Sequence, residues 1–216
     1  MAHHERLDGF GYPQGVLGAS LSMAGQIVAV AEMLTGLLES GSRQAERASV
    51  AMKLVPGEFN RRFIDRIALA ARAGGVQAND DDAPPNAAEL QSRVANQGAA
   101  IHRVRELRGC LAIEMARFGA PLRSLLTHAF ERWERIAIAF SSTGLDLGGP
   151  ALLESMTGPE LIEVGIVLRE LQWRIRELER QLLIRSELLA PSDAQRVLQL
   201  IEQAKRPSAS ELSAAA

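Results

Sequence analysis

Apolar residues recur every three or four positions over a long stretch near the C-terminus, and no proline interrupts them. The positions are Leu161, Val164, Leu168, Leu171, Ile175, Leu178, Leu182, Arg185 and Leu189, and all of them except Arg185 are apolar. This spacing predicts one long helix with a continuous seam for another helix. We expect the positions from Leu161 to Leu182 to mediate self-association. In a parallel pair Arg174 would lie opposite Glu179, which favours a dimer, although the same stripes could also close into one intramolecular bundle.

Stripes of the same period occur along most of the chain, and no strand pattern of any length is present. They predict helices over about 16–40, 43–55, 58–73, 87–119, 121–141, 158–189 and 192–204. Residues 142–157 contain Gly144, Gly148, Gly149 and Pro150, so we expect a loop there with at most a short helical turn. The predicted fold is an all-α helical bundle with long heptad-patterned, coiled-coil-like helices.

The clearest break in the pattern lies at residues 76–88, where three aspartates are followed by two prolines. Such a segment cannot propagate a helix and is predicted to be an exposed linker. It separates an N-terminal helical region, residues 1–75, from a long-helix region, residues 89–206. The first contains a helix-turn-helix-like pair that we do not expect to bind DNA. The Ser- and Ala-rich residues 207–216 are predicted to be disordered.

The net charge of −2 argues against binding of nucleic acid or anionic membrane through overall charge. A single cysteine, Cys110, excludes an intrachain disulfide. The uncharged stretch Val16–Ala31 is followed by Glu32, which falls inside any window long enough for a membrane span. The start of the chain lacks the basic segment of a signal peptide. We therefore expect a cytoplasmic protein that binds neither nucleic acid nor membrane.

No residue pattern indicates a catalytic, cofactor or metal site. His3 and His4 stand in an irregular start without ligand partners nearby, and no Glu precedes any His by three residues, as a four-helix di-iron site would require. The glycines of 142–157 lack the Gly-Lys-Ser/Thr of a phosphate-binding loop. We expect no cofactor. The basic face Arg61, Arg62 and Arg66 is either a solvated helix face or a docking surface for an acidic protein partner.

The long seams, together with the absence of reactive constellations, suggest a non-enzymatic scaffold, adaptor or structural subunit that self-associates. A first alternative is an accessory chaperone of a bacterial secretion or conjugation system, suggested by the small residues of 16–40 and by the basic face. A second alternative is a helical enzyme whose site is built from scattered Arg, Glu and His residues.

Overall fold

The computed structural model describes residues 3–39, 45–73 and 84–206. Over these ranges the chain is helical and forms no β-strand, apart from one isolated bridge between Asp8 and Leu17. The predicted all-α class is therefore confirmed, whereas the coiled-coil detail is not. Within the same ranges, no helix combines the length and apolar character that crossing a bilayer requires.

The chain divides into two compact units, and neither is one continuous stretch. The N-terminal unit combines Met1–Asn86 with Met156–Glu170, and the C-terminal unit combines Ala87–Ser155 with Leu171–Ala216. The long helix α7, Gly158–Ser186, contributes its first part to the one and its remainder to the other. The proposed linker 76–88 lies largely outside the described residues, so the domain division made from the sequence stays a prediction.

The N-terminal unit begins with an irregular lead, residues 3–17, followed by the 3-10 turn Gly18–Ser20. Its helices are α1 (Met23–Leu37), α2 (Ala45–Lys53) and α3 (Arg61–Ala73). The first helix begins later than the sequence suggested because the Gly18 N–H donates to the Leu7 carbonyl instead, at 2.9 Å. The side chain of Ser22 then caps α1 by accepting from the Gly25 N–H at 3.1 Å.

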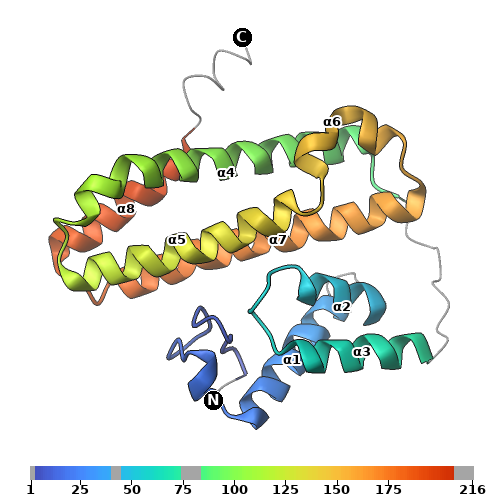
Figure 1. Ribbon diagram of the computed structural model, residues 1–216, viewed down its shortest axis with the longest axis horizontal. Helices are drawn as coiled ribbons and strands as arrows, with labels where there is room; N and C mark the ends of the chain where they lie inside the picture. The colour runs from blue at the N-terminus through green and yellow to red at the C-terminus, as the bar shows by residue number, and fades with distance from the viewer. Residues whose placement is uncertain (1–2, 40–44, 74–83, 207–216) are drawn as a thin grey trace. The chain divides into compact units, whose positions relative to one another are not determined.

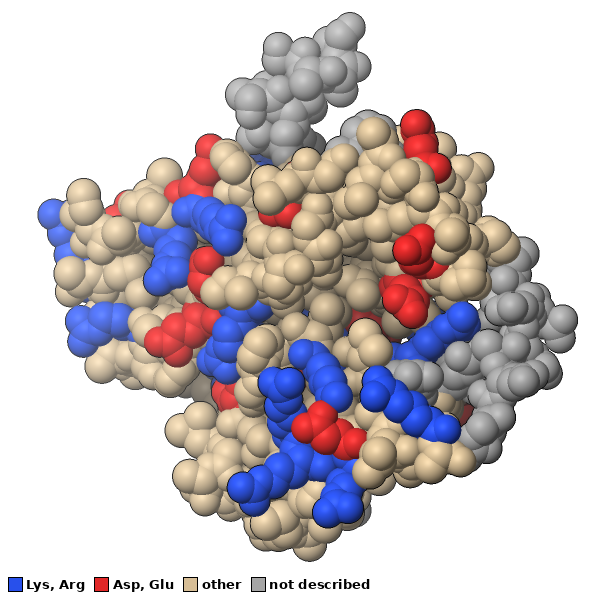
Figure 2. Space-filling view, turned by 45° about the vertical axis from the view of Figure 1, so that its right-hand side comes forward, with Lys and Arg blue, Asp and Glu red and all other residues tan. Residues whose placement is uncertain are grey.

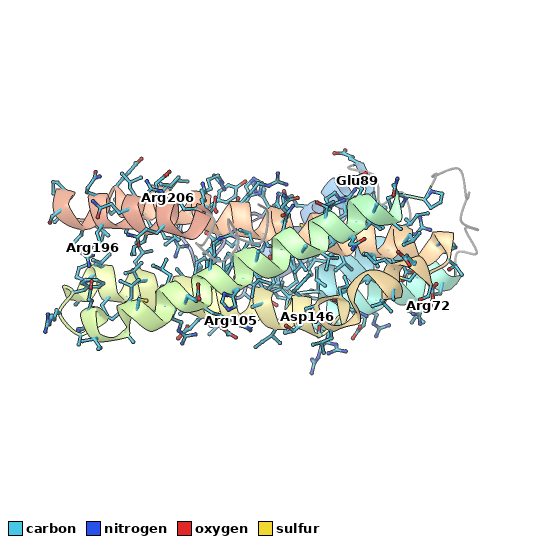
Figure 3. The ribbon with its side chains drawn as sticks, turned by 90° about the horizontal axis from the view of Figure 1, so that it is seen from above. Arg72, Glu89, Arg105, Asp146, Arg196 and Arg206 are labelled. Atoms are coloured by element: carbon cyan, nitrogen blue, oxygen red, sulfur yellow. The ribbon has the colours of Figure 1, made fainter. Side chains whose placement is uncertain are left out.

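The C-terminal unit contains α4 (Ala87–Met115), α5 (Ala120–Ser141), α6 (Leu145–Glu154), the end of α7 and α8 (Pro191–Lys205). Figure 1 shows α4, α5 and α8 running alongside this part of α7. A hydrophobic core joins α4, α5 and α8 through Leu111 from α4, Leu122 and Leu126 from α5, and Val197, Leu200 and Ile201 from α8. At the end where α4 and α5 meet, Arg196 of α8 bonds to Glu114 and lies over the Phe118 ring (Figure 3).

Helix α6 is longer than the short turn that the sequence predicted. Its sequence carries two glycines and a proline, which disfavour helix when taken alone. Gly144 precedes it with a φ of 72°, a conformation that glycine adopts readily. Leu145 and Leu153 are buried, so packing of one face against the bundle outweighs the local propensity.

Candidate functional site

The lead of the N-terminal unit folds around the buried carboxylate of Glu5, which is 1% exposed. Its Oε1 accepts a hydrogen bond from the Gln14 N–H at 2.8 Å, and its Oε2 accepts one from the Val16 N–H at 2.9 Å. Gly11 passes so close that an added Cβ would lie 2.2 Å from the Glu5 Cα. These bonds hold the lead between Glu5 and Val16 in a defined structure.

This structure brings His4 against Glu32 of α1. The His4 Nδ1 lies 3.2 Å from Oε1 of Glu32, and the Arg6 guanidinium lies 3.7 Å from Oε2 of the same carboxylate. Arg6 is 7% exposed and lies over the Phe59 ring, 4.7 Å from its centroid. Glu32 is thus shared between an imidazole and a nearly buried arginine.

Aromatic rings cover the other side of this pair. The His4 ring stacks on Tyr12 with a centroid distance of 4.3 Å, and the His3 ring lies 4.0 Å from His4 in a tilted arrangement. The Tyr12 N–H also donates to the His4 carbonyl at 3.2 Å, which holds the two residues together. We call His3, His4, Arg6, Tyr12 and Glu32 the His4–Glu32 site.

A carboxylate at one imidazole nitrogen favours the tautomer whose other nitrogen can accept a proton. At this site Glu32 lies at Nδ1 of His4, so Nε2 is the atom that can exchange a proton with a substrate. The ligand-type side chains are His3, His4 and Glu32. No three His, Cys, Asp or Glu side chains in the described ranges converge as a metal site would require.

The sequence pattern did not predict this site. His3 and His4 were expected to lack partners nearby, and the structure corrects that expectation, because Glu32 reaches His4 through the folding of the lead onto α1. Two signals were present in the sequence. Glu32 is the one charge between Val16 and Leu38, and the lead is rich in glycines that a tightly folded segment needs.

The predicted docking residues Arg61, Arg62 and Arg66 are exposed on α3, where Arg61 lies 3.9 Å from Asp65. Figure 2 shows Lys and Arg side chains gathering around acidic ones in the lower half of the view, over the N-terminal helices. Neighbouring opposite charges of this kind also occur on ordinary solvated faces. Docking of an acidic partner stays a prediction.

The predicted self-association residues lie along α7, and the chain itself covers many of them. Val164, Leu168, Leu171 and Leu178 are buried, whereas Leu161, Ile175 and Leu182 are half-buried. Their apolar character is therefore used at least in part within one chain. Self-association through them stays a prediction.

Comparison with known proteins points to enzymes. A family model described as an HD domain matches residues 1–66, the segment that contains the whole His4–Glu32 site. A cyclic di-GMP phosphodiesterase response regulator of Xanthomonas campestris pv. campestris is 33% identical over 78 residues, which is 36% of this chain and 21% of that protein. A 3'3'-cGAMP-specific phosphodiesterase of Vibrio cholerae is 45% identical over 38 residues, 18% of this chain and 9% of that protein. No solved structure matches the chain.

These similarities overturn the function expected from the sequence. A non-enzymatic scaffold defined by coiled-coil oligomerisation and protein interaction does not agree with an HD-domain match and two phosphodiesterase relatives. The error arose because long apolar seams dominate the sequence pattern, while the site joins residues that lie far apart along the chain. The chain spans about a fifth of the first relative and a tenth of the second, and its similarity to them points to an HD-type hydrolase.

Proposed function

We propose that the N-terminal unit is part of an HD-type phosphodiesterase that hydrolyses a phosphodiester bond of a cyclic dinucleotide. The observation that carries the proposal is the HD-domain match over the residues that build the His4–Glu32 site. Both curated relatives are named as phosphodiesterases of cyclic dinucleotides, which supports this substrate class.

The side chains of the site suit this chemistry. Hydrolysis adds water to phosphorus and breaks the bond from phosphorus to one ribose oxygen. In the proposal, Nε2 of His4 takes the proton of the attacking water and returns it to the leaving oxygen, while Glu32 stabilises the imidazolium between the two transfers. Arg6 supplies positive charge beside this pair, where it can stabilise the charge of the phosphoryl group.

The rings of the site can serve the purine bases. A base has a flat π-face that stacks on aromatic side chains, and such stacking is worth about 1–3 kcal/mol per base. Tyr12 and His3 flank His4 and offer such faces. We further propose that the protein acts in the cytoplasm, since its single cysteine cannot form an intrachain disulfide.

The test is hydrolysis of cyclic di-GMP and of 3'3'-cGAMP by the full chain, followed by chromatography of the linear product. The assay is run with and without added divalent metal ions, since many phosphoryl transfers use them. We expect His4→Ala to lower the rate by about 100-fold or more, the usual contribution of a general acid–base group.

His102→Ala is the matched control, because His102 pairs with Glu106 on the exposed surface of α4 in the same Nδ1-to-carboxylate manner. This variant should keep the wild-type rate. The proposal fails if the wild-type chain hydrolyses neither dinucleotide under any of these conditions, or if His4→Ala hydrolyses them as fast as the wild type.

A further inference from the structure

A short segment just before α3 bonds to both parts of the chain that build the candidate site. The Glu58 carbonyl accepts a hydrogen bond from the Leu7 N–H of the lead at 3.0 Å. The side chain of Asn60 donates from Nδ2 to Oε1 of Gln26 on α1, at 2.7 Å. These two bonds tie the segment to the lead and to α1, and they flank Phe59 on either side.

Phe59 packs directly on a residue of the site. It is 6% exposed, and the Cζ of Arg6 lies 4.7 Å from the centroid of its ring. A cation over an aromatic face is attracted by the negative potential of the ring, and more strongly where water is excluded. Arg6 is 7% exposed, so little water reaches this contact. The Phe59 ring therefore fixes where the charge of Arg6 lies.

The position of this charge matters for Glu32. The Oε2 atom of Glu32 is buried and accepts no hydrogen bond from the described residues, and the Arg6 guanidinium lies 3.7 Å away. A buried carboxylate oxygen is unfavourable unless a donor or an opposite charge compensates it. Arg6 supplies that charge at Oε2, while Oε1 faces Nδ1 of His4 at 3.2 Å. Contacts thus lead from the Phe59 ring through Arg6 to the histidine–glutamate pair.

We propose that Phe59 is a positioning residue, which holds Arg6 against Glu32 and so keeps the carboxylate oriented toward the imidazole of the site. Phe59 touches none of the reacting atoms and acts through the guanidinium. Its role in hydrolysis rests on the proposed function, whereas the orientation of the pair can be measured without any substrate. A packing role alone would require the size of the Phe59 side chain but not the negative potential of its ring.

The orientation is measured from the NMR signals of the imidazole nitrogens in the full chain, which report which nitrogen carries the proton. A carboxylate at Nδ1 favours the proton on that atom. In Phe59→Leu, which keeps an apolar side chain but removes the ring, the His4 signals should move toward those of His128, which is exposed on α5. Unchanged His4 signals in the folded variant overturn the proposal.

Fluorination tests the ring face without a change of shape. Site-specific replacement of Phe59 by pentafluorophenylalanine keeps the ring but removes the negative potential of its face. It should shift the His4 signals in the same direction as Phe59→Leu, and it takes the place of that variant if Phe59→Leu does not fold. Phe59→Tyr, which retains the face, should keep the wild-type signals. Wild-type signals in the fluorinated protein would assign Phe59 to packing alone and overturn the proposal.

The hydrolysis assay gives a second readout. Phe59→Leu and the fluorinated protein should lower kcat by about tenfold, as expected for loss of a desolvated cation–π contact, and should leave KM within about twofold. Phe63→Leu is the matched control, because it makes the same substitution at a half-buried position of α3, and it should keep the wild-type kcat. A higher KM with an unchanged kcat in the Phe59 variants would show that Phe59 serves substrate binding and would overturn the proposal.

The two readouts separate this inference from the proposed function. If the wild-type chain hydrolyses no cyclic dinucleotide, the phosphodiesterase proposal fails, while the His4 signals of the variants still decide whether Phe59 orients the pair. If the wild-type chain is active and the Phe59 variants keep both its kcat and its His4 signals, the phosphodiesterase proposal stands and the positioning role fails.

Discussion

Each compact unit contains a histidine–glutamate pair, and the two pairs differ in how the chain makes them. In the N-terminal unit the His4 Nδ1 lies 3.2 Å from Glu32, with 29% and 38% of the two side chains exposed. In the C-terminal unit the His102 Nδ1 lies 3.6 Å from Glu106, with 72% and 58% exposed. The first pair joins an irregular lead to a helix, whereas the second lies within one turn of α4.

The difference shows which of the two kinds of pair is suited to a catalytic site. Residues four apart on a helix are neighbours by geometry, and such an exposed pair contributes only a few tenths of a kcal/mol. The His4–Glu32 pair exists only if the lead folds onto α1. Its geometry therefore depends on residues that touch neither side chain, and changes at those residues separate the two pairs most strongly.

Gly11→Ala should have the largest effect on the His4–Glu32 site. An added Cβ would lie 2.2 Å from the Glu5 Cα and 2.3 Å from the Arg6 nitrogen, so the backbone of the lead must move. We expect a loss of about 3 kcal/mol or more from the N-terminal unit, at or above the upper end of the usual cost of overpacking. Urea unfolding monitored by circular dichroism measures this loss, and phosphodiesterase activity should fall with it.

Gly36→Ala is the control, because a Cβ at Gly36 of α1 would meet nothing within 4 Å. It should stabilise the helix by about 0.5–1 kcal/mol, since alanine has the higher helix propensity. Equal stability of the two variants would mean that the lead is not packed as the structure describes.

The same contrast explains how much of the fold could be predicted. Helical periodicity is a local property, so the sequence located α4, α5, α7 and α8 closely. Local signals also predicted the start of α7, where Thr157 precedes the helix and Glu160 lies in its first turn. Helix α6 was underestimated because Gly148, Gly149 and Pro150 disfavour helix locally, and only tertiary packing overrides them.

The candidate site could not be predicted in the same way. Its two central residues, His4 and Glu32, lie far apart in the sequence, and no spacing rule connects them. The contact arises from backbone bonds, such as the one from the Leu7 N–H to the Glu58 carbonyl at 3.0 Å, that a single sequence does not reveal. The burial of Glu5 is equally hard to predict from the sequence, because a glutamate side chain is ordinarily exposed.

Glu5→Ala should have the second largest effect. It removes the acceptor of two backbone N–H groups, those of Gln14 and Val16, inside a segment where Glu5 is 1% exposed. We expect a loss of about 2–3 kcal/mol, the range for charged hydrogen bonds and for buried donors left without a partner. Hydrogen exchange of the Gln14 and Val16 amides should accelerate accordingly.

Glu106→Ala provides the comparison in the other unit, since it removes a carboxylate whose side chain is 58% exposed. Its effect on the free energy of unfolding should stay within about 0.5 kcal/mol. If Gln14 and Val16 exchange at the same rates in Glu5→Ala as in the wild type, the lead does not depend on this carboxylate.

A double-mutant cycle compares the two pairs directly. The variants are His4→Ala and Glu32→Ala with their double mutant, and the same set at His102 and Glu106, all measured by urea unfolding under one set of conditions. The coupling between His4 and Glu32 should be about 1 kcal/mol, and that between His102 and Glu106 about 0.3 kcal/mol. The reverse order would show that the fold adds nothing to the first pair.

The smallest effect is expected at Glu160, whose partner is again local. Its Oε2 accepts from the N–H and the hydroxyl of Thr157, at 2.7 and 2.8 Å, and these bonds lower the pKa of Glu160 from its ordinary 4.5. A carboxylate whose pKa is lower in the folded state stabilises the protein fully above its unfolded pKa and loses that contribution as the pH falls through the folded value. Glu160→Gln should therefore reduce the stability near pH 7 and have a progressively smaller effect below pH 4.5.

Salt separates this contact from the one made by Glu5. Because Glu160 is fully exposed, added salt should reduce the loss of stability caused by Glu160→Gln. The loss caused by Glu5→Ala should hardly change with salt, since Glu5 acts through buried hydrogen bonds. Unfolding measured at low and at high ionic strength thus separates a contact made within one helical turn from one made by the folding of the lead.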